Sequence, residues 1–139
     1  MAAVTRRARG QALVEFVLVT PLFLLLIVGV ITLGLVVRTD GAVSAIATEA
    51  ARAAALASTP AAAVTAGRTR GGDVAQGYGL DPNQVTVNVD TSAFGRGGEV
   101  GTTADYTLAL NLPLLDPILR TVSFHRAGIE PIAPNRSFR

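Results

Sequence analysis

The chain has 139 residues and a formal net charge of +2, so it has room for one domain at most. It contains no cysteine, which excludes disulfides and thiolate metal sites. Three of its 12 basic residues (Arg6, Arg7 and Arg9) precede a long apolar run. The remaining nine face 10 acidic residues, so the basic balance does not indicate a nucleic-acid partner.

The apolar run covers residues 16–37, which is 22 residues without a charge. As a helix it spans about 30 Å, the thickness of the hydrocarbon core of a bilayer. A secretory signal peptide has a shorter apolar core of about 7–15 residues followed by a small-residue cleavage site. A buried core helix of this length needs a much larger domain to cover it. The run therefore predicts a single transmembrane helix over residues 13–37.

Flanking charges predict the orientation of this helix. The arginines before the run have no acidic counterparts, whereas Arg38 after it is balanced by Asp40. The positive-inside rule then places the N-terminus in the cytoplasm and the C-terminal part outside the inner membrane. Pro21 lies within the run, and we expect it to bend the helix because it removes one backbone hydrogen bond.

Glu15 stands immediately before the apolar run and has two interpretations. In the first, its side chain extends to the headgroup layer at the membrane edge. In the second, "RRARG" followed by "QALVEF" resembles a prepilin leader, a short basic segment that ends in glycine. Residues 1–10 would then be removed by a prepilin peptidase, and the mature chain would begin at Gln11. A carboxylate four residues along a helix lies about one turn from the new amine, so Glu15 is a candidate subunit-pairing group.

The helical pattern continues over residues 40–58, which are rich in alanine, the residue with the highest helix propensity. Ser44, Thr48 and Arg52 form a polar stripe, and small apolar residues share another face. We therefore expect one helix over residues 11–58, with a membrane part and an amphipathic extension. The apolar face comprises Val43, Ile46, Ala47, Ala50, Ala53 and Ala54.

Two stretches carry a resemblance to a known family. The segments "RGQALVEFVLVTPLFLLLIVGVITLG" and "AIATEAARAAALA" are similar to the TadE-like family of tight-adherence (Flp-type) pilus assembly. The opening Gln-Ala-x-Val-Glu-Phe, the proline that follows and the Ala-Ala-Arg near the helix end match. The resemblance implies a minor pilin or pseudopilin with a long N-terminal helix and a small C-terminal β domain.

The second half of the chain predicts the sheet of an α+β fold. Residues 59–84 are expected to form a loop, residues 85–132 a small antiparallel sheet of about three strands, and residues 133–139 a tail. Alternating apolar residues predict strands near 85–90, 102–112 and 121–132, with a bend or short helical turn at 114–120 between the last two. A sheet with one apolar face needs a cover, and the amphipathic end of the long helix is the expected one.

No pattern in the sequence predicts catalysis. His125 is the only histidine and is expected on the surface of a strand. The acidic residues lack the spacing of a metal loop, and the glycine clusters lack the lysine and the strand-to-helix context of a phosphate loop. We therefore expect no catalytic residue, metal or cofactor.

Three functional interpretations follow. The first is a minor pilin or pseudopilin in the inner membrane. The resemblance implies as its partners the prepilin peptidase, other TadE-like subunits, the major pilin, the membrane platform of the pilus machine and the lipid bilayer. The second is an uncleaved single-pass membrane protein whose exposed sheet binds a ligand or an envelope protein. The third is a subunit that docks on the machine and never enters a filament.

Overall fold

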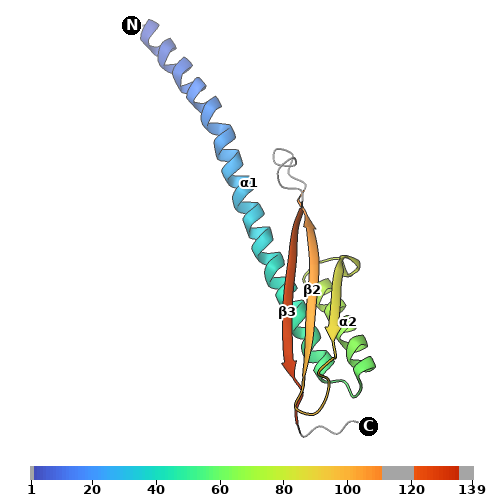
Figure 1. Ribbon diagram of the computed structural model, residues 1–139. Coiled ribbons are helices and arrows are strands. Elements are labelled where there is room, and N and C mark those ends of the chain that lie inside the picture. The colour runs from blue at the N-terminus through green and yellow to red at the C-terminus, as the bar shows by residue number, and fades with distance from the viewer. Residues whose placement is uncertain (1, 111–120, 135–139) are drawn as a thin grey trace. The chain divides into compact units, whose positions relative to one another are not determined.

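The computed structural model describes residues 2–110 and 121–134, with the backbone alone for residues 2–12. The chain divides into two compact units, Met1–Val36 and Val37–Arg139, and the second is called the sheet unit below. Figure 1 shows the elements: α1 (Ala2–Ala55), α2 (Pro60–Gly77), a short 3-10 helix (Pro82–Gln84), β1 (Val85–Asp90), β2 (Glu99–Ala109) and β3 (Thr121–Pro131). The predicted α+β class is confirmed.

α1 confirms the predicted long N-terminal helix. It runs from Ala2 to Ala55 and remains helical through Pro21, and it includes the backbone of the predicted leader. It ends three residues before the predicted end at 58. The N–H groups of Leu56 and Ala57 donate to the carbonyls of Ala53 and Ala54, three residues back, at 3.3 and 3.1 Å. Such bonds are typical of a last helical turn that tightens before the chain leaves the helix.

α2 corrects the prediction of a loop over residues 59–84. Pro60–Gly77 is an 18-residue helix despite four internal or terminal glycines. Its start has a clear physical cause. The side-chain oxygen of Thr59 accepts a hydrogen bond from the N–H of Ala62 at 3.2 Å and so caps the N-terminus of the helix. Pro60 occupies the first turn, where a backbone N–H would have no acceptor within the helix, so its missing N–H costs nothing there.

The three strands form one antiparallel sheet in the order β1-β2-β3 (Figure 1). The register places Val87 opposite Ala104 and Ala104 opposite Arg126. β1 lies where it was predicted, whereas β2 begins at Glu99, three residues earlier than expected. The bend predicted at 114–120 lies outside the described residues.

Both helices cover the same face of this sheet. The prediction that the long helix alone would cover it was therefore wrong. The alternate residues Val87, Val100, Thr102, Ala104 and Phe124 are buried on that face. Their neighbours along the strands form the outer face, which is mostly polar and also carries the exposed Ile129. The predicted polar stripe of α1 is confirmed, because its three members are exposed. On the predicted apolar face Ala53 is only half-buried. The buried residues of α1 are Thr39, Ala42, Val43, Ile46, Ala47, Ala50, Ala51, Ala54 and Ala55.

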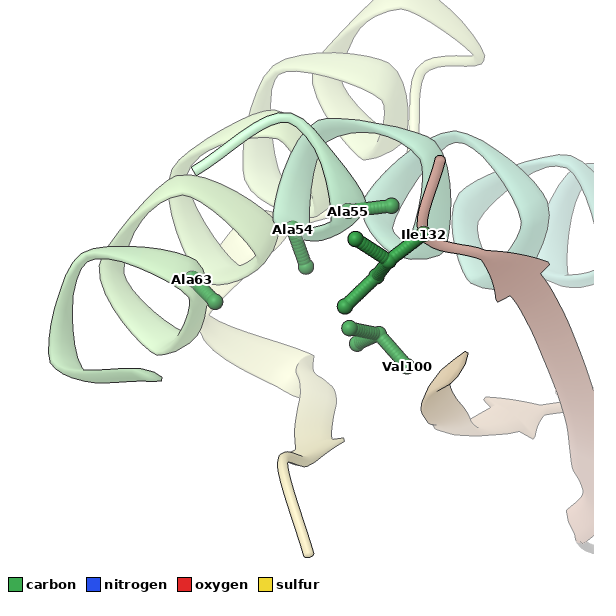
Figure 2. Packing of buried hydrophobic residues seen from close by; sticks show 5 residues of the cluster. All are labelled: Ala54, Ala55, Ala63, Val100 and Ile132. Atoms are coloured by element: carbon green, nitrogen blue, oxygen red, sulfur yellow. The ribbon is translucent and has the colours of Figure 1, made fainter. Parts of the chain in front are cut away.

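The core is built mainly from small side chains. Figure 2 shows one cluster in which alanines of α1 and α2 meet two branched residues from the strand side; its members are Ala54, Ala55, Ala63, Val100 and Ile132. Side chains of this size allow the helix and strand backbones to approach closely, so the packing depends on the absence of larger groups.

Glycines mark the closest approaches. A Cβ atom on Gly128 of β3 would lie 2.6 Å from the carbonyl oxygen of Ala47 in α1. On α2, a Cβ on Gly67 or on Gly71 would lie 2.8 Å from a methyl group of β1, on Val89 and Val87 respectively. The glycines that lower the helix propensity of α2 are therefore the residues that let it pack against the sheet.

Thr102 joins the sheet to α1 by a buried hydrogen bond. Its hydroxyl donates to the carbonyl of Ala47 at 2.6 Å, and its side chain is 2% exposed. We expect Thr102→Val, which keeps the shape and removes the donor, to lower the free energy of unfolding by about 1 kcal/mol. Chemical denaturation would measure it, with the exposed Thr107→Val on the same strand as the control. Equal effects of the two variants would contradict this role.

Candidate assembly and processing site

Residues 13–36 of α1, called the stem below, carry large apolar side chains on all sides. Within the described residues, Leu13–Ala55 is the one helix long and apolar enough to cross a membrane. None of its most apolar stretch is buried against the rest of the chain. Leu22 is 70% exposed and Ile27 is 42% exposed, and most of the other large apolar side chains of the stem are exposed as well. A surface this apolar needs lipid or protein around it.

The stem has three polar side chains, and two of them form hydrogen bonds within their own helix. The Thr20 hydroxyl donates to the carbonyl of Phe16 at 2.6 Å, and the Thr32 hydroxyl donates to that of Val28 at 2.8 Å. Both bonds stay within the helix, so these threonines place no polar demand on a neighbouring molecule.

Glu15 is the third polar side chain, and it is different. It is exposed, and no residue whose side chain the structure describes forms a hydrogen bond or an ion pair with it. It directly precedes a shallow apolar groove along one side of the stem, lined by Phe16, Val19, Thr20, Phe23 and Leu24. A carboxylate at the edge of such a surface favours binding to a cationic partner.

The predicted processing residues lie upstream on the same helix. Gly10 and Gln11 belong to α1, as do Arg6, Arg7 and Arg9. Four residues separate Gln11 from Glu15, which is about one helical turn and a rise of about 6 Å. Cleavage after Gly10 and pairing through Glu15 stay predictions.

The ionisable groups of the sheet unit form separate exposed pairs. Arg126 of β3 lies 2.6 and 2.7 Å from the two carboxylate oxygens of Asp40 in α1, and this hydrogen bond and charge raise the pKa of the guanidinium. His125 pairs with Asp105 at 2.5 Å on the outer face, at the exposed place predicted for it. Exposed pairs of this kind add little to the stability of a fold.

Two more contacts were not visible in the sequence. Besides Arg52 at 3.0 Å, three residues along the same helix, Glu49 of α1 also binds Arg70 of α2 at 3.1 Å. The N–H of Ser92 donates to the carboxylate of Asp90 at 2.9 Å and lowers the pKa of Asp90. Across the described residues, no three His, Asp or Glu side chains gather as metal ligands would.

Comparisons with known proteins place the stem in a family. Residues 10–52 match the TadE family, described as TadE-like protein. No curated protein and no solved structure matches the chain. The matched segment contains Gly10, Glu15 and Pro21, whereas α2 and the sheet lie outside it.

The family match and the apolar stem support the same conclusions. Together they indicate a membrane-anchored protein that is associated with the Tad pilus and its machinery. Members of such a family are structural proteins, which agrees with the packing surfaces described above. Residues 10–52 therefore form a TadE-like segment, and a small antiparallel sheet follows it in the chain.

Proposed function

We propose that the chain is a minor pilin or pseudopilin that helps to assemble a tight-adherence (Flp-type) pilus. One observation carries the proposal: Glu15 is an acidic side chain without a partner among the described side chains, and it stands at the end of an exposed apolar stem. A plain membrane anchor needs the apolar stem but has no use for an unpaired carboxylate at its edge.

Processing would provide the partner for this carboxylate. A prepilin peptidase would hydrolyse the Gly10–Gln11 peptide bond, which leaves a carboxylate on Gly10 and a new amine on Gln11. The amine of one subunit then pairs with Glu15 of the next. Because both charges sit at the edge of hydrocarbon, where water competes poorly, this pairing favours one register between packed stems.

The rest of the stem supports side-by-side packing. Its two threonines bond to their own helix, so neighbouring stems meet an apolar surface with no unsatisfied hydroxyl. In lipid, such association depends on close van der Waals contact rather than on hydrophobic burial. Other TadE-like subunits, the major pilin and the membrane platform of the machine are the partners that fit this surface.

The flanking arginines support insertion into the inner membrane with the N-terminus in the cytoplasm and the sheet unit outside. We expect a C-terminal alkaline phosphatase fusion to the full chain to be active, because that enzyme folds only outside the cytoplasm. An inactive phosphatase fusion, together with an active fusion of a cytoplasmic reporter at the same position, would contradict this topology.

Processing has a direct genetic test. In the host, we expect the chain to lose 10 residues (1–10) in a peptidase-dependent manner and Gly10→Leu to keep them. Gly34→Leu is the matched control, since a Cβ at that stem glycine meets no atom within 4 Å. Equal sizes for the wild-type chain and Gly10→Leu would contradict processing at this bond.

The polar outer face of the sheet favours a second candidate, an uncleaved single-pass protein whose sheet binds a ligand or another envelope protein. A third candidate is a processed subunit that remains in the membrane. Shearing of surface fibres separates the first and third, because a filament subunit appears in the sheared fraction. The uncleaved protein is recognised by its full-length mass.

A further inference from the structure

The hydrogen-bonding pattern shows which strand edges have no partner strand among residues 2–110 and 121–134. The N–H of Ile132 donates to the carbonyl of Gly98 at 2.8 Å and extends the β2–β3 ladder. Because bonded and non-bonded pairs alternate in antiparallel sheets, the even-numbered residues of β2 bond to β3 and the odd-numbered ones to β1. The N–H of Val85 agrees, since it donates away from β2 to Pro82. The peptide groups of Val87 and Val89 therefore point to the free edge of β1.

A groove runs along this edge between β1 and α2. It is lined by Arg68 and Gly72 of α2, by Pro82 and by residues 85–88. Arg68 is exposed and has no hydrogen-bond or ion-pair partner within the described part of the chain. A Cβ on Gly72 would meet no atom within 4 Å, so the groove has room beside the strand. Free peptide groups, an unpaired cation and open space together favour an added strand that carries a carboxylate.

The other edge of the sheet offers such a strand. β3 has 11 residues, and by the same alternation the peptide groups of Ser123, His125, Ala127 and Ile129 point away from β2. Glu130 lies on the helix-covered side of β3, opposite Val100, with no ion-pair partner among the described residues. Long unpaired edges are usually shielded in stable proteins, so the edge of β3 favours pairing with another strand.

The direction of the elements selects which edges can meet. β1 and β3 are both antiparallel to β2 and so run parallel to each other. The α1 segment of the sheet unit runs along β3, with Asp40 at Arg126 and Ala47 at Gly128. If two copies paired through the same strand, β1 with β1 or β3 with β3 in antiparallel, their α1 segments would start at opposite ends of the joined sheet. Parallel pairing of unlike edges puts both starts at the same end, as two copies anchored in one membrane require.

We infer that β3 of a second copy adds in parallel to β1 and fills the groove beside α2. Within one chain, Thr102 of β2 pairs with Val89 of β1 on one side and with Gly128 of β3 on the other. Val89 and Gly128 therefore lie at the same position along the strand direction. A shift of two residues, about 7 Å, brings Glu130 of the second copy level with Val89 and toward Arg68. The contact is head-to-tail, so it continues from copy to copy as a row. It requires membrane anchoring and goes beyond the proposed function, because it does not depend on leader cleavage.

Cysteine cross-linking tests the inference cleanly, since the chain has no cysteine of its own. In this register Asn88 lies beside Ile129 of the neighbouring copy. Within one chain β2 separates them by about 10 Å, beyond the roughly 7 Å that a disulfide can bridge. We expect the full-length Asn88→Cys/Ile129→Cys chain, oxidised in membranes, to form a disulfide-linked ladder.

Three further chains define the outcomes of this test. Asn88→Cys combined with Ala127→Cys or His125→Cys samples other registers. Gln76→Cys with Ile129→Cys, from an exposed residue of α2 outside the groove, measures random collision. Failure of all three Asn88 pairs to exceed the collision control overturns the inference, as does cross-linking of Asn88→Cys to a different protein only.

A filled groove gives the second test. Gly72→Leu and Gly77→Leu both point into open space on α2, so both chains should fold, but only the first obstructs the groove. We expect Gly72→Leu to reduce cross-linking at least tenfold and Gly77→Leu to leave it unchanged. Arg68→Glu or Glu130→Arg should each weaken cross-linking about two- to fivefold, and the double variant should restore it. Equal ladders from both leucine variants would contradict the groove as the contact.

Discussion

Gly128→Ala is expected to destabilise the sheet unit by about 2–4 kcal/mol, from overpacking together with loss of a buried hydrogen bond. The added Cβ would lie 2.6 Å from the carbonyl oxygen of Ala47, a backbone atom that moves only if α1 moves. That oxygen also accepts the hydroxyl hydrogen of Thr102. If β3 moves away from α1 to make room for the added Cβ, the packing of β3 against α1 and the hydrogen bond of Thr102 are weakened together. For a unit of this size the melting temperature should fall by roughly 10–25 °C.

Gly101→Ala is the matched control for this prediction. It lies on β2, its Cβ would be an ordinary 3.7 Å from the Cβ of Asp90, and it faces away from the helices. We expect it to be neutral or slightly stabilising, since glycine weakens a strand. The intrinsic fluorescence of the two tyrosines, Tyr78 and Tyr106, reports unfolding of the sheet unit without interference from the stem, because both lie in that unit and the chain has no tryptophan. A smaller effect for Gly128→Ala than for Gly101→Ala would show that the close approach does not limit stability.

Glu15→Ala is expected to leave membrane insertion intact and to reduce association with other pilins at least tenfold. The stem stays apolar without the carboxylate, so the helix still enters the bilayer. The new amine of the neighbouring subunit would, however, be left without its partner in an apolar surrounding, which is costly. Co-purification of partner pilins from detergent-solubilised membranes measures the loss.

Glu49→Ala controls for the removal of a carboxylate from α1. Glu49 already binds Arg52 and Arg70 within its own chain, so its loss should affect the α1–α2 contact and not association. Unchanged co-purification of partner pilins with the Glu15→Ala chain would contradict the pairing role of Glu15.

Much of α1 could be predicted from the sequence, because its signals are local. An uninterrupted apolar run and an alanine-rich continuation determine a helix without any tertiary contact. α2 was missed because its glycines and threonines lower helix propensity, and the tertiary contacts that stabilise it are not local. Thr59 followed by Pro60 was the available signal, as a capping residue before a first-turn proline.

The sheet shows where such reasoning stops. Period-two alternation located the strands, but the buried position of Gly128 depends on the approach of Ala47, some 80 residues earlier in the chain. The pairing of Arg126 with Asp40 joins equally distant segments. Neither contact has a local signature, so only the folded chain reveals them.

The candidate site divides in the same way. Glu15, Gly10 and Gln11 are recognisable in the sequence because they lie within a few residues of one another. The groove at β1 and the free edge of β3 became visible only with the strand order and the register of the ladder. The sequence therefore predicted the stem as a packing element, and the fold adds a second packing surface outside the family segment.

The mass of the intact protein purified from its native host tests the proposal most directly. If the stem works as a pilin stem, the measured mass corresponds to a chain that begins at Gln11, and sequencing reads Gln-Ala-Leu-Val-Glu from the first cycle. A functional protein that still carries residues 1–10 would leave Glu15 with no new amine to bind and would contradict the pilin interpretation.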